Sequence, residues 1–207
     1  MDKKISVLLI DDDPEEIFVH NFRKIIALDK RLEYIGHASS GELGVEMACS
    51  RNPDIVVVDL NLAGADDNQE GAVVAREIRL KTGIRVVLAT NYFKDDDSVI
   101  IAASKKAFAS GYFLKSQFRD FASIIYETAT SNTPLKALIK GLIRDDFTPA
   151  VAEILDAVVG KKQDVLDRIG ETLVNRYKTA IFKTLGINPD VPEGKRTEVL
   201  IRLYENW

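Results

Sequence analysis

Short apolar runs alternate with longer amphipathic segments along the first part of the chain. The runs are Val7–Ile10, Ile55–Val58, Val86–Ala89 and Tyr112–Leu114. Runs of this length, rich in β-branched and aliphatic side chains, are typical of buried strands in a parallel sheet, and the segments between them carry helical patterns. The pattern predicts strands and helices that alternate until about Thr130. We therefore expect an α/β fold with a doubly wound, five-stranded parallel sheet.

A polar residue follows each of these runs. In chain order the runs end in Asp11, Asp12 and Asp13, then in Asp59, Thr90 and Lys115. Because ligands of parallel sheets bind beyond the carboxyl ends of the strands, these side chains are expected to meet at one edge. Crowded carboxylates repel one another and need a cation, and a cluster of oxygen ligands suits Mg²⁺. A carboxylate beside such a metal, with an ammonium group and a hydroxyl to hold oxygens, can accept a phosphoryl group.

In this combination the chain resembles the receiver domain of two-component response regulators, over roughly residues 4–130. The matching elements are the acid pair after the first strand, the Asp after the third, the Thr after the fourth and the Lys on the fifth. The resemblance implies a flavodoxin-like fold, Mg²⁺ as the cofactor and a sensor histidine kinase as the phosphate donor. It also implies that Asp11, Asp12 and Asp59 hold Mg²⁺, that Asp59 accepts the phosphate, and that Thr90 and Lys115 bind the phosphoryl oxygens.

Each of these residues also has an ordinary structural interpretation. An Asp at the end of a strand is usually a helix cap or a turn residue, and Asp13 before Pro14 is expected to be only that. By the resemblance Tyr112, three residues before Lys115, is the switch aromatic, but an aromatic beside a buried strand often only packs in the core. Four strand-end signals in the right order favour the functional interpretation.

The chain departs from the family pattern around the acceptor. Ala63 stands where the family often has Pro, and the loop that follows, Gly64–Glu70, is longer than usual and carries extra acids. Asn91 follows Thr90 where a small residue is usual, which bears on the rates of phosphate entry and hydrolysis. Ser116 follows Lys115 where the family often has Pro. None of these changes removes the chemistry.

Composition adds a few limits. With 207 residues and a formal net charge of −4, the chain fits one large or two small domains of an ordinary soluble protein. Cys49 is the single cysteine, which excludes an internal disulfide framework, and it is expected to be a small buried residue. No segment approaches membrane-spanning length, and we expect a cytoplasmic protein. His20 and His37 lack partners at ligand spacing, so neither is expected to bind a metal.

Beyond a turn cluster at Ser131–Pro134 the chain shows only helical patterns. The segment Pro134–Arg144 predicts a short amphipathic helix whose apolar stripe consists of Leu135, Leu138, Ile139, Leu142 and Ile143. We expect a receiver domain over residues 1–130, a linker with this amphipathic helix over 131–146, and an all-α output domain over 147–207.

Inside the output domain the pattern indicates a helix-turn-helix layout. Thr148 and Pro149 predict the start of a helix. A short helix, a turn at Gly170, a longer helix and a last helix are expected to follow, over Gln163–Ile169, over Glu171–Leu185 and from Arg196 onward.

This half resembles the four-helix DNA-binding domain of the LuxR and NarL family, over roughly residues 145–206. The matching pieces are Phe147–Pro149, Val165–Gly170, Ile181–Ile187 and Arg196–Glu198. The resemblance makes the longer helix the recognition helix. The DNA contacts that we expect on it are Arg176, Lys178 and Lys183.

Charge weakens the case for DNA. The usual Thr-Val-Lys near the start of the recognition helix becomes Leu173-Val174-Asn175, which loses a cation. From Asp145 to Ile187 there are six Lys and Arg against seven Asp and Glu, whereas most DNA-binding domains carry a positive balance. A solvated helix face is therefore the ordinary interpretation of the three cations.

Two functions follow from the sequence. The favoured one is a transcription factor that is controlled by phosphorylation and becomes a homodimer on DNA when activated. The alternative is a response regulator whose divergent helical output binds a protein partner. An RNA-binding antiterminator output is disfavoured by the Phe147–Pro149 and Arg196–Glu198 pieces. No catalytic constellation occurs after residue 131, so we expect no enzymatic output.

Overall fold

The computed structural model describes residues 3–13, 15, 17–62, 70–91, 97–116, 120–131 and 133–205. Pro14, Ala63 and most of the acidic loop expected at Gly64–Glu70 lie outside the described residues, and Glu70 begins a helix. The chain folds into two compact units, with the division after Ile139.

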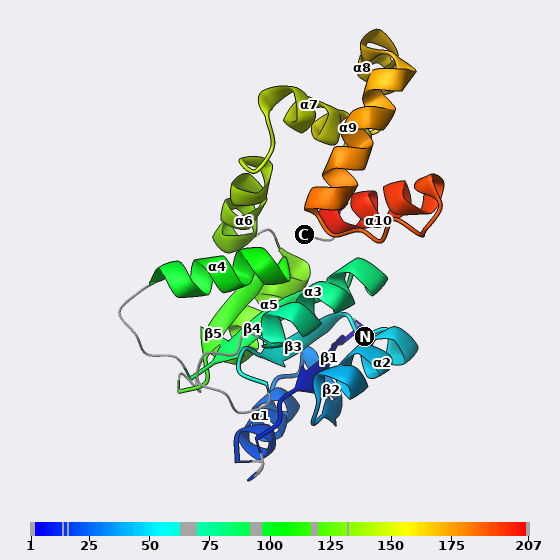
Figure 1. Cartoon of the computed structure of the whole chain (residues 1–207). Coiled ribbons are helices and arrows are strands. Elements are labelled where there is room, and N and C mark those ends of the chain that lie inside the picture. Colours follow the sequence, from blue (N-terminus) through cyan, green and yellow to red (C-terminus); the bar gives the residue numbers. More distant parts are fainter. Residues whose placement is uncertain are drawn as a thin grey trace. The chain divides into compact units, whose positions relative to one another are not determined.

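The first unit contains a five-stranded parallel sheet with the strand order β2-β1-β3-β4-β5, shown in Figure 1. Its strands are β1 (Ile5–Ile10), β2 (Leu32–Ala38), β3 (Ile55–Asp59), β4 (Arg85–Thr90) and β5 (Gly111–Leu114). Its helices are α1 (Ile17–Leu28), α2 (Gly41–Arg51), α3 (Glu70–Thr82), α4 (Asp97–Ala107) and α5 (Phe121–Thr130). The order and the parallel pairing confirm the predicted doubly wound fold.

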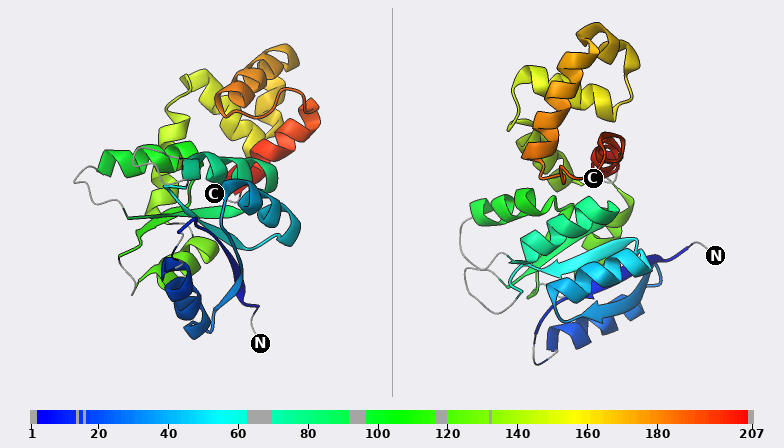
Figure 2. Two further views of the ribbon diagram at one scale, coloured as in Figure 1. Left: turned by 60° about the horizontal axis from the view of Figure 1, so that its bottom comes forward. Right: turned by 45° about the vertical axis from the view of Figure 1, so that its right-hand side comes forward.

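Helices cover both faces of the sheet, as the two views of Figure 2 show. Even-numbered core positions of β1, β3 and β4, such as Leu8 and Val58, pack against α2, α3 and α4. Their odd-numbered neighbours, such as Leu9 and Val57, pack against α1 and α5. Because successive side chains of a strand point to opposite faces, burial on both faces gives the continuous apolar runs seen in the sequence.

An aromatic cluster fills the layer between the sheet and α1 and α5. Phe113 of β5 stacks on Phe121 of α5 with ring centroids 5.3 Å apart, and Phe121 stacks on Phe22 of α1 at 5.1 Å. Phe18, one turn before Phe22, lies 5.7 Å from it. These rings bury large apolar areas in favourable offset or tilted arrangements, so they fix α1 and α5 relative to the end of β5.

The second unit is helical. Its helices are α7 (Pro149–Val159), α8 (Gln163–Ile169), α9 (Glu171–Thr184) and α10 (Glu193–Glu205). Thr148 occupies the N-cap of α7 with Pro149 in the first turn, as predicted, although the Thr148 side chain makes no capping hydrogen bond. Gly170, with φ of 88°, separates α8 from α9 at the predicted turn.

The last helix begins earlier than the sequence predicts. We expected it from Arg196, whereas α10 starts at Glu193. The residue before it is Pro192, whose carbonyl accepts a hydrogen bond from the Arg196 N–H at 3.0 Å and so closes the first turn. An acidic residue in the first turn interacts favourably with the helix dipole, which explains the earlier start.

Helix α6 (Pro134–Arg144) has the bounds that the apolar stripe predicts, and the division between the units falls inside it. Its first turn is tied to the first unit. The Lys136 ammonium donates hydrogen bonds to the carbonyls of Thr128, at 2.8 Å, and of Ser131, at the end of α5. A cation at a helix C-terminus is favourable, so these bonds join the start of α6 to α5. The predicted domain bounds remain a prediction.

Two expectations from composition concern single features. Cys49 is exposed, so the expectation that it is buried is wrong. The buried face of α2 is formed by Gly41, Gly44, Val45 and Ala48, and Cys49 follows Ala48 onto the outer side of the helix. Within the residues that the structure describes, no helix is both long and apolar enough to cross a membrane.

We predict that Gly71→Ala destabilises the first unit. A Cβ at Gly71 would overlap the backbone oxygen of Asp59, because α3 starts directly against the end of β3. Such overpacking lowers the free energy of unfolding by about 1–3 kcal/mol. Gly141→Ala in α6 is the matched control. A Cβ there meets nothing within 4 Å, and Ala is favoured over Gly in a helix by up to about 1 kcal/mol. Urea unfolding that ranks the two variants in the opposite order would contradict the prediction.

Candidate functional site

The alternation along the strands brings three charged residues to one place. Leu9, Val57 and Phe113 face the layer with α1 and α5. The residue two positions further along each strand points the same way, and these are Asp11, Asp59 and Lys115. The structure therefore brings the side chains at the carboxyl ends of β1, β3 and β5 together on one face of the sheet, as the strand-end pattern predicts.

A buried ion pair network joins the three residues. The Lys115 Nζ lies 2.7 Å from Asp59 Oδ2, with which it forms a hydrogen bond, and forms an ion pair with Asp11 Oδ2, also at 2.7 Å. Asp11 is fully buried, and the exposed fractions of Asp59 and Lys115 are only 7% and 5%. Two carboxylates thus share one ammonium group away from water.

The charges at this site shift one another's pKa values. Burial raises the pKa of the Asp59 carboxyl, and the Lys115 ammonium only partly offsets this effect. For Lys115, burial alone would lower the pKa, but attraction by Asp59 and Asp11 and their hydrogen bonds outweigh it and raise the pKa. Lys115 is therefore held charged, while the ionised form of Asp59 lacks full compensation. A further cation beside Asp59 would supply it.

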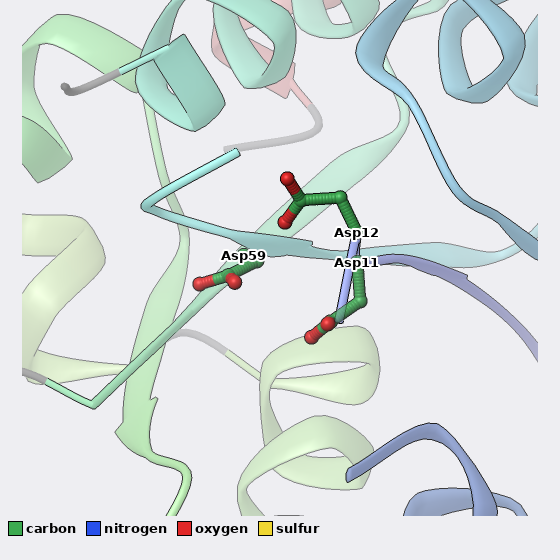
Figure 3. Close-up of side chains that lie close together, drawn as sticks. All are labelled: Asp11, Asp12 and Asp59. Atoms are coloured by element: carbon green, nitrogen blue, oxygen red, sulfur yellow. The ribbon is translucent and has the colours of Figure 1, made fainter. Parts of the chain in front are cut away.

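Three carboxylates are placed to hold such a cation. Asp11, Asp12 and Asp59 each offer one oxygen, and these oxygens all lie within 4.8 Å of one another. Figure 3 shows these three side chains close together. An all-oxygen set with open positions fits Mg²⁺, which keeps several waters and is bound by few carboxylates. Asp13 is not part of this set.

Asp13 has the structural role that we expected. Its carboxylate accepts hydrogen bonds from the backbone N–H of Glu15, at 3.0 Å, and of Phe18, at 3.2 Å. The bond from Phe18 satisfies a free donor in the first turn of α1, and the bond from Glu15 holds the turn before it. The turn that follows β1 thus supplies Asp11 and Asp12 to the group of three carboxylates, and Asp13 as the cap of α1.

Thr90 lies on β4 and Tyr112 on β5, which follow β3 in the sheet on the side away from β1. Thr90 is buried at the end of β4, and its carbonyl accepts a hydrogen bond from the Lys115 N–H at 2.8 Å. Tyr112 pairs with Leu88 in the ladder, two residues before Thr90, so Tyr112 and Thr90 face the same side of the sheet. The Tyr112 side chain is 37% exposed, so it is not a core residue in this conformation.

A cavity of about 460 Å³ opens onto the Asp59 carboxylate. Its lining combines polar and apolar side chains: Asp13, Ile17, Phe18, Asp59, Asn91, Lys115 and Ser116. Asn91 and Ser116, two departures from the family pattern, therefore border the site directly. Phe18 was not identified from the sequence, where it has the pattern of an ordinary apolar position in α1.

His37 also touches the site through the backbone. Its Nε2 lies 2.7 Å from the carbonyl oxygen of Asp11, one of the three clustered acids. The Asp11 N–H donates to the carbonyl of Ala38 at 3.0 Å. Both polar groups of the Asp11 backbone are thus held by β2, which steadies the turn that carries the acids. No local pattern indicates this contact, because it depends on the pairing of β1 with β2.

In the second unit the three expected cations of α9 do not share one face. Arg176 and Lys183 are exposed and seven residues apart, which places them on the same side of the helix. Lys178 is turned toward α10, where its Nζ lies 3.5 Å from a carboxylate oxygen of Glu193. The structure therefore brings Arg176 and Lys183 together and separates Lys178 from them.

Acidic residues surround Lys178. A cavity of about 560 Å³ between α8, α9 and the start of α10 is lined by Gln163, Leu166, Asp167, Glu171, Val174, Asn175, Lys178 and Glu193. Three of these side chains are acids and one is a cation, so this side of α9 is negative. The exposed side with Arg176 and Lys183 is the only side of the described helix on which two cations lie together.

Comparisons with known proteins extend along the whole chain. A family model described as response regulator receiver domain matches residues 7–125. The nitrate/nitrite response regulator NarL of Escherichia coli is 27% identical over 183 residues, which cover 83% of this chain and 77% of that protein. The transcriptional regulatory protein LiaR of Bacillus subtilis is 26% identical over 216 residues and covers 98% of each protein. The similarity therefore continues past the sheet into the helical unit.

A solved structure shares the fold at similar length. The RcsB response regulator of Salmonella typhimurium is 14% identical, matches 96% of both chains and gives a TM-score of 0.52. At this level of identity the match concerns the fold, a parallel sheet followed by a helical unit.

We predict that Asp59→Asn stabilises the protein in the absence of divalent cations. Because the folded-state pKa of Asp59 is raised, the folded protein binds this proton more tightly than the unfolded chain does. The stability of the wild type therefore falls as the pH rises through that pKa, and Asn removes this loss. The free energy of unfolding at pH 7 should be higher in the variant, and the gain should shrink toward a pH of about 4. Urea unfolding in EDTA at several pH values measures it.

Asp54→Asn is the control with the opposite sign. Burial alone would raise the pKa of Asp54, but hydrogen bonds from Ser6 and Lys3 outweigh it and lower the pKa. Its ionised form is thus stabilising above the unfolded pKa, and this contribution is lost as the pH falls. The variant should be less stable than the wild type at pH 7 and equal to it in acid. The same pH trend in both variants would contradict the assignment for Asp59.

Proposed function

This chain belongs to the response regulator receiver family, and we propose that it accepts a phosphoryl group on Asp59 and thereby regulates transcription. The observation that carries the proposal is the buried set of Asp59, Lys115 and Asp11 at the edge of the sheet, where a cavity opens onto Asp59. Asp59 is a buried carboxylate whose negative charge is only partly offset by Lys115, which makes it a candidate nucleophile. The Lys115 ammonium group beside it can bind an incoming anion.

The chain's own residues have distinct roles in the proposed transfer. An Asp59 oxygen attacks the phosphorus of a phosphohistidine in a sensor kinase, and the histidine nitrogen leaves as the new O–P bond forms. The Lys115 ammonium, now 2.7 Å from Asp59 Oδ2, is placed to bind a phosphoryl oxygen. The Thr90 hydroxyl is the second proposed donor to these oxygens, and its backbone already contacts that of Lys115.

The fit of the acidic set to Mg²⁺ suggests which residues would hold it. Asp11 and Asp12 together with Asp59 would bind the ion. When bound, Mg²⁺ supplies positive charge that offsets the phosphoryl oxygens and the carboxylates. Asp11 is held in place for this by Lys115 and by the Asp13 N–H, which donates to its Oδ1 at 3.1 Å.

The proposed switch uses Thr90 and Tyr112. In a phosphorylated chain the Thr90 hydroxyl moves toward the phosphoryl group, and the Tyr112 ring fills the space that it leaves. Support comes from their position on one face of the sheet and from the exposure of Tyr112, which leaves the ring a second packing. The reshaped surface is proposed to pair two receivers into a homodimer.

For the output we propose DNA binding through α9. The names of the relatives support it, since LiaR is a transcriptional regulatory protein, and so does the layout of α8, Gly170 and α9. Arg176 and Lys183 are the proposed principal contacts because they are exposed on one face. Lys178, expected from the sequence as a third contact, is paired with Glu193 and becomes a minor one.

We predict that Asp59 is the single phospho-acceptor. Incubation with a small phosphodonor and Mg²⁺ should add one phosphate to the intact mass of the wild type and none to Asp59→Asn, which lacks the nucleophile. Asp12→Ala should need at least roughly tenfold more Mg²⁺ to reach the same phosphorylation rate, because even the loss of an outer-shell partner lowers the metal affinity by that factor. Asp54→Asn is the matched control, because Asp54 precedes β3, at the opposite end of that strand from Asp59, and it should react like the wild type. A phosphate adduct of equal yield on Asp59→Asn would show that the acceptor is elsewhere.

We predict that Arg176→Ala weakens DNA binding by roughly 1–3 kcal/mol, the value for a residue that reads a base edge. Lys178→Ala removes one positive charge from the same helix but faces Glu193, so its effect should be smaller. Selection from random duplex DNA with phosphorylated full-length protein at low salt identifies the sequence, and fluorescence anisotropy compares the variants. Equal losses in both variants would contradict the assigned face.

The same selection decides between DNA and a protein partner. The near-neutral charge balance and the acids around Lys178 are the observations that favour the alternative. If no sequence is enriched, and a purified protein partner binds the phosphorylated chain in stoichiometric amount, the output is a protein-binding domain.

A further inference from the structure

The ammonium group of Lys115 has an aromatic partner in addition to its carboxylates. The Lys115 Nζ lies over the ring of Phe18, 4.8 Å from the ring centroid. A cation within about 6 Å of a ring centroid is attracted by the negative face of the ring, and more strongly where water is excluded. Phe18 is 6% exposed and lines the cavity that opens onto Asp59. The ring therefore forms part of the apolar wall of the acceptor cavity.

The ring is held by its neighbours. Phe18 contacts Phe22, Phe113 and Phe121, with centroids 5.7, 6.5 and 6.4 Å away. Phe113 precedes Lys115 by two residues on β5, so the ring packs on the strand that carries the ammonium group. At its other end, the Phe18 N–H donates to the Asp13 carboxylate at 3.2 Å. Both the backbone and the ring of Phe18 are thus fixed relative to the site.

We propose that Phe18 is a positioning residue for Lys115, an inference that rests on the proposed phosphoryl transfer. Asp59 and Asp11 hold the ammonium from one side, and the ring holds it from another and keeps water away. During transfer the Asp59 carboxylate becomes an acyl phosphate, and Lys115 has to turn from the Asp59 oxygen to a phosphoryl oxygen. The Lys115 ammonium group can move between these two oxygens while it stays over the face of the Phe18 ring. A flexible lysine side chain would otherwise lose this position to solvent.

Three variants separate this role from ordinary core packing. Phe18→Leu removes the aromatic face and keeps an apolar side chain, and Phe18→Tyr keeps the face. Phe22→Leu is the matched control, because Phe22 belongs to the same aromatic cluster but has no contact with Lys115 among the described interactions. With a small phosphodonor and saturating Mg²⁺, we expect Phe18→Leu to take up phosphate about three- to tenfold more slowly than the wild type. Phe18→Tyr should restore the rate, and Phe22→Leu should change it little.

A second measurement uses the unphosphorylated protein. Acetylation of amines by an N-hydroxysuccinimide ester, followed by peptide mass spectrometry, reports how open Lys115 is to solvent. Labelling of Lys115 should be several-fold faster in Phe18→Leu than in Phe22→Leu, with Phe18→Tyr close to the wild type. Calorimetric titration with Mg²⁺ should give the same affinity in the wild type and the three variants, because none of the substitutions changes Asp11, Asp12 or Asp59.

The outcomes distinguish this inference from the proposed function. If the wild type takes no phosphate on Asp59, the proposed function fails, and the role of Phe18 in transfer fails with it. If the wild type is phosphorylated but Phe18→Leu and Phe22→Leu behave alike in both rate and labelling, only the role of Phe18 is overturned. Slow transfer and fast labelling confined to Phe18→Leu, with rescue by Phe18→Tyr, support the inference.

Discussion

One buried ammonium group that serves two buried carboxylates is the constraint on which the first unit depends. Removing charges from water costs several kcal/mol per ion unless they are paired at close range, so Asp11, Asp59 and Lys115 have to be brought together by the fold itself. The sheet does this across β4, which lies between β3 and β5. Ala89 of β4 pairs with Asp59 on one side and with Phe113 on the other. Its small side chain leaves room for the Lys115 side chain to reach over.

The same requirement shapes the helix that covers this face. The turn after β1 carries Asp11 and Asp12 into the site, and Asp13 then fixes the start of α1 by capping it. Once α1 starts there, Phe18 comes to lie over Lys115, and the aromatic cluster locks helix and strand together. The buried ion pairs of Asp11, Asp59 and Lys115 and the aromatic core beneath them are therefore one structure.

The sequence predicts those features that local pattern determines. Asp59 and Lys115 could be recognised because each follows an apolar run, and the polarity of a parallel sheet brings the ends of such runs together. The bounds of α6 and α8 follow from periodicity and from Gly170. Other features depend on tertiary contacts: the aromatic partner of Lys115, the exposed side of α2 at Cys49, and the pairing of Lys178 with Glu193. Charge and periodicity alone do not tell which of several exposed helix positions faces a neighbouring helix.

The electrostatics of the second unit bear on the proposed binding of DNA. One side of α9 carries Arg176 and Lys183, while the other is dominated by acids and binds Lys178 to Glu193. With so few cations available, a single copy would displace few counterions and hold duplex DNA weakly, with a shallow dependence on salt. Two copies joined through their receivers would bind the second half-site at a high effective concentration. Under the proposed function, pairing of receivers, and hence phosphorylation of Asp59, would therefore be the factor that controls DNA binding.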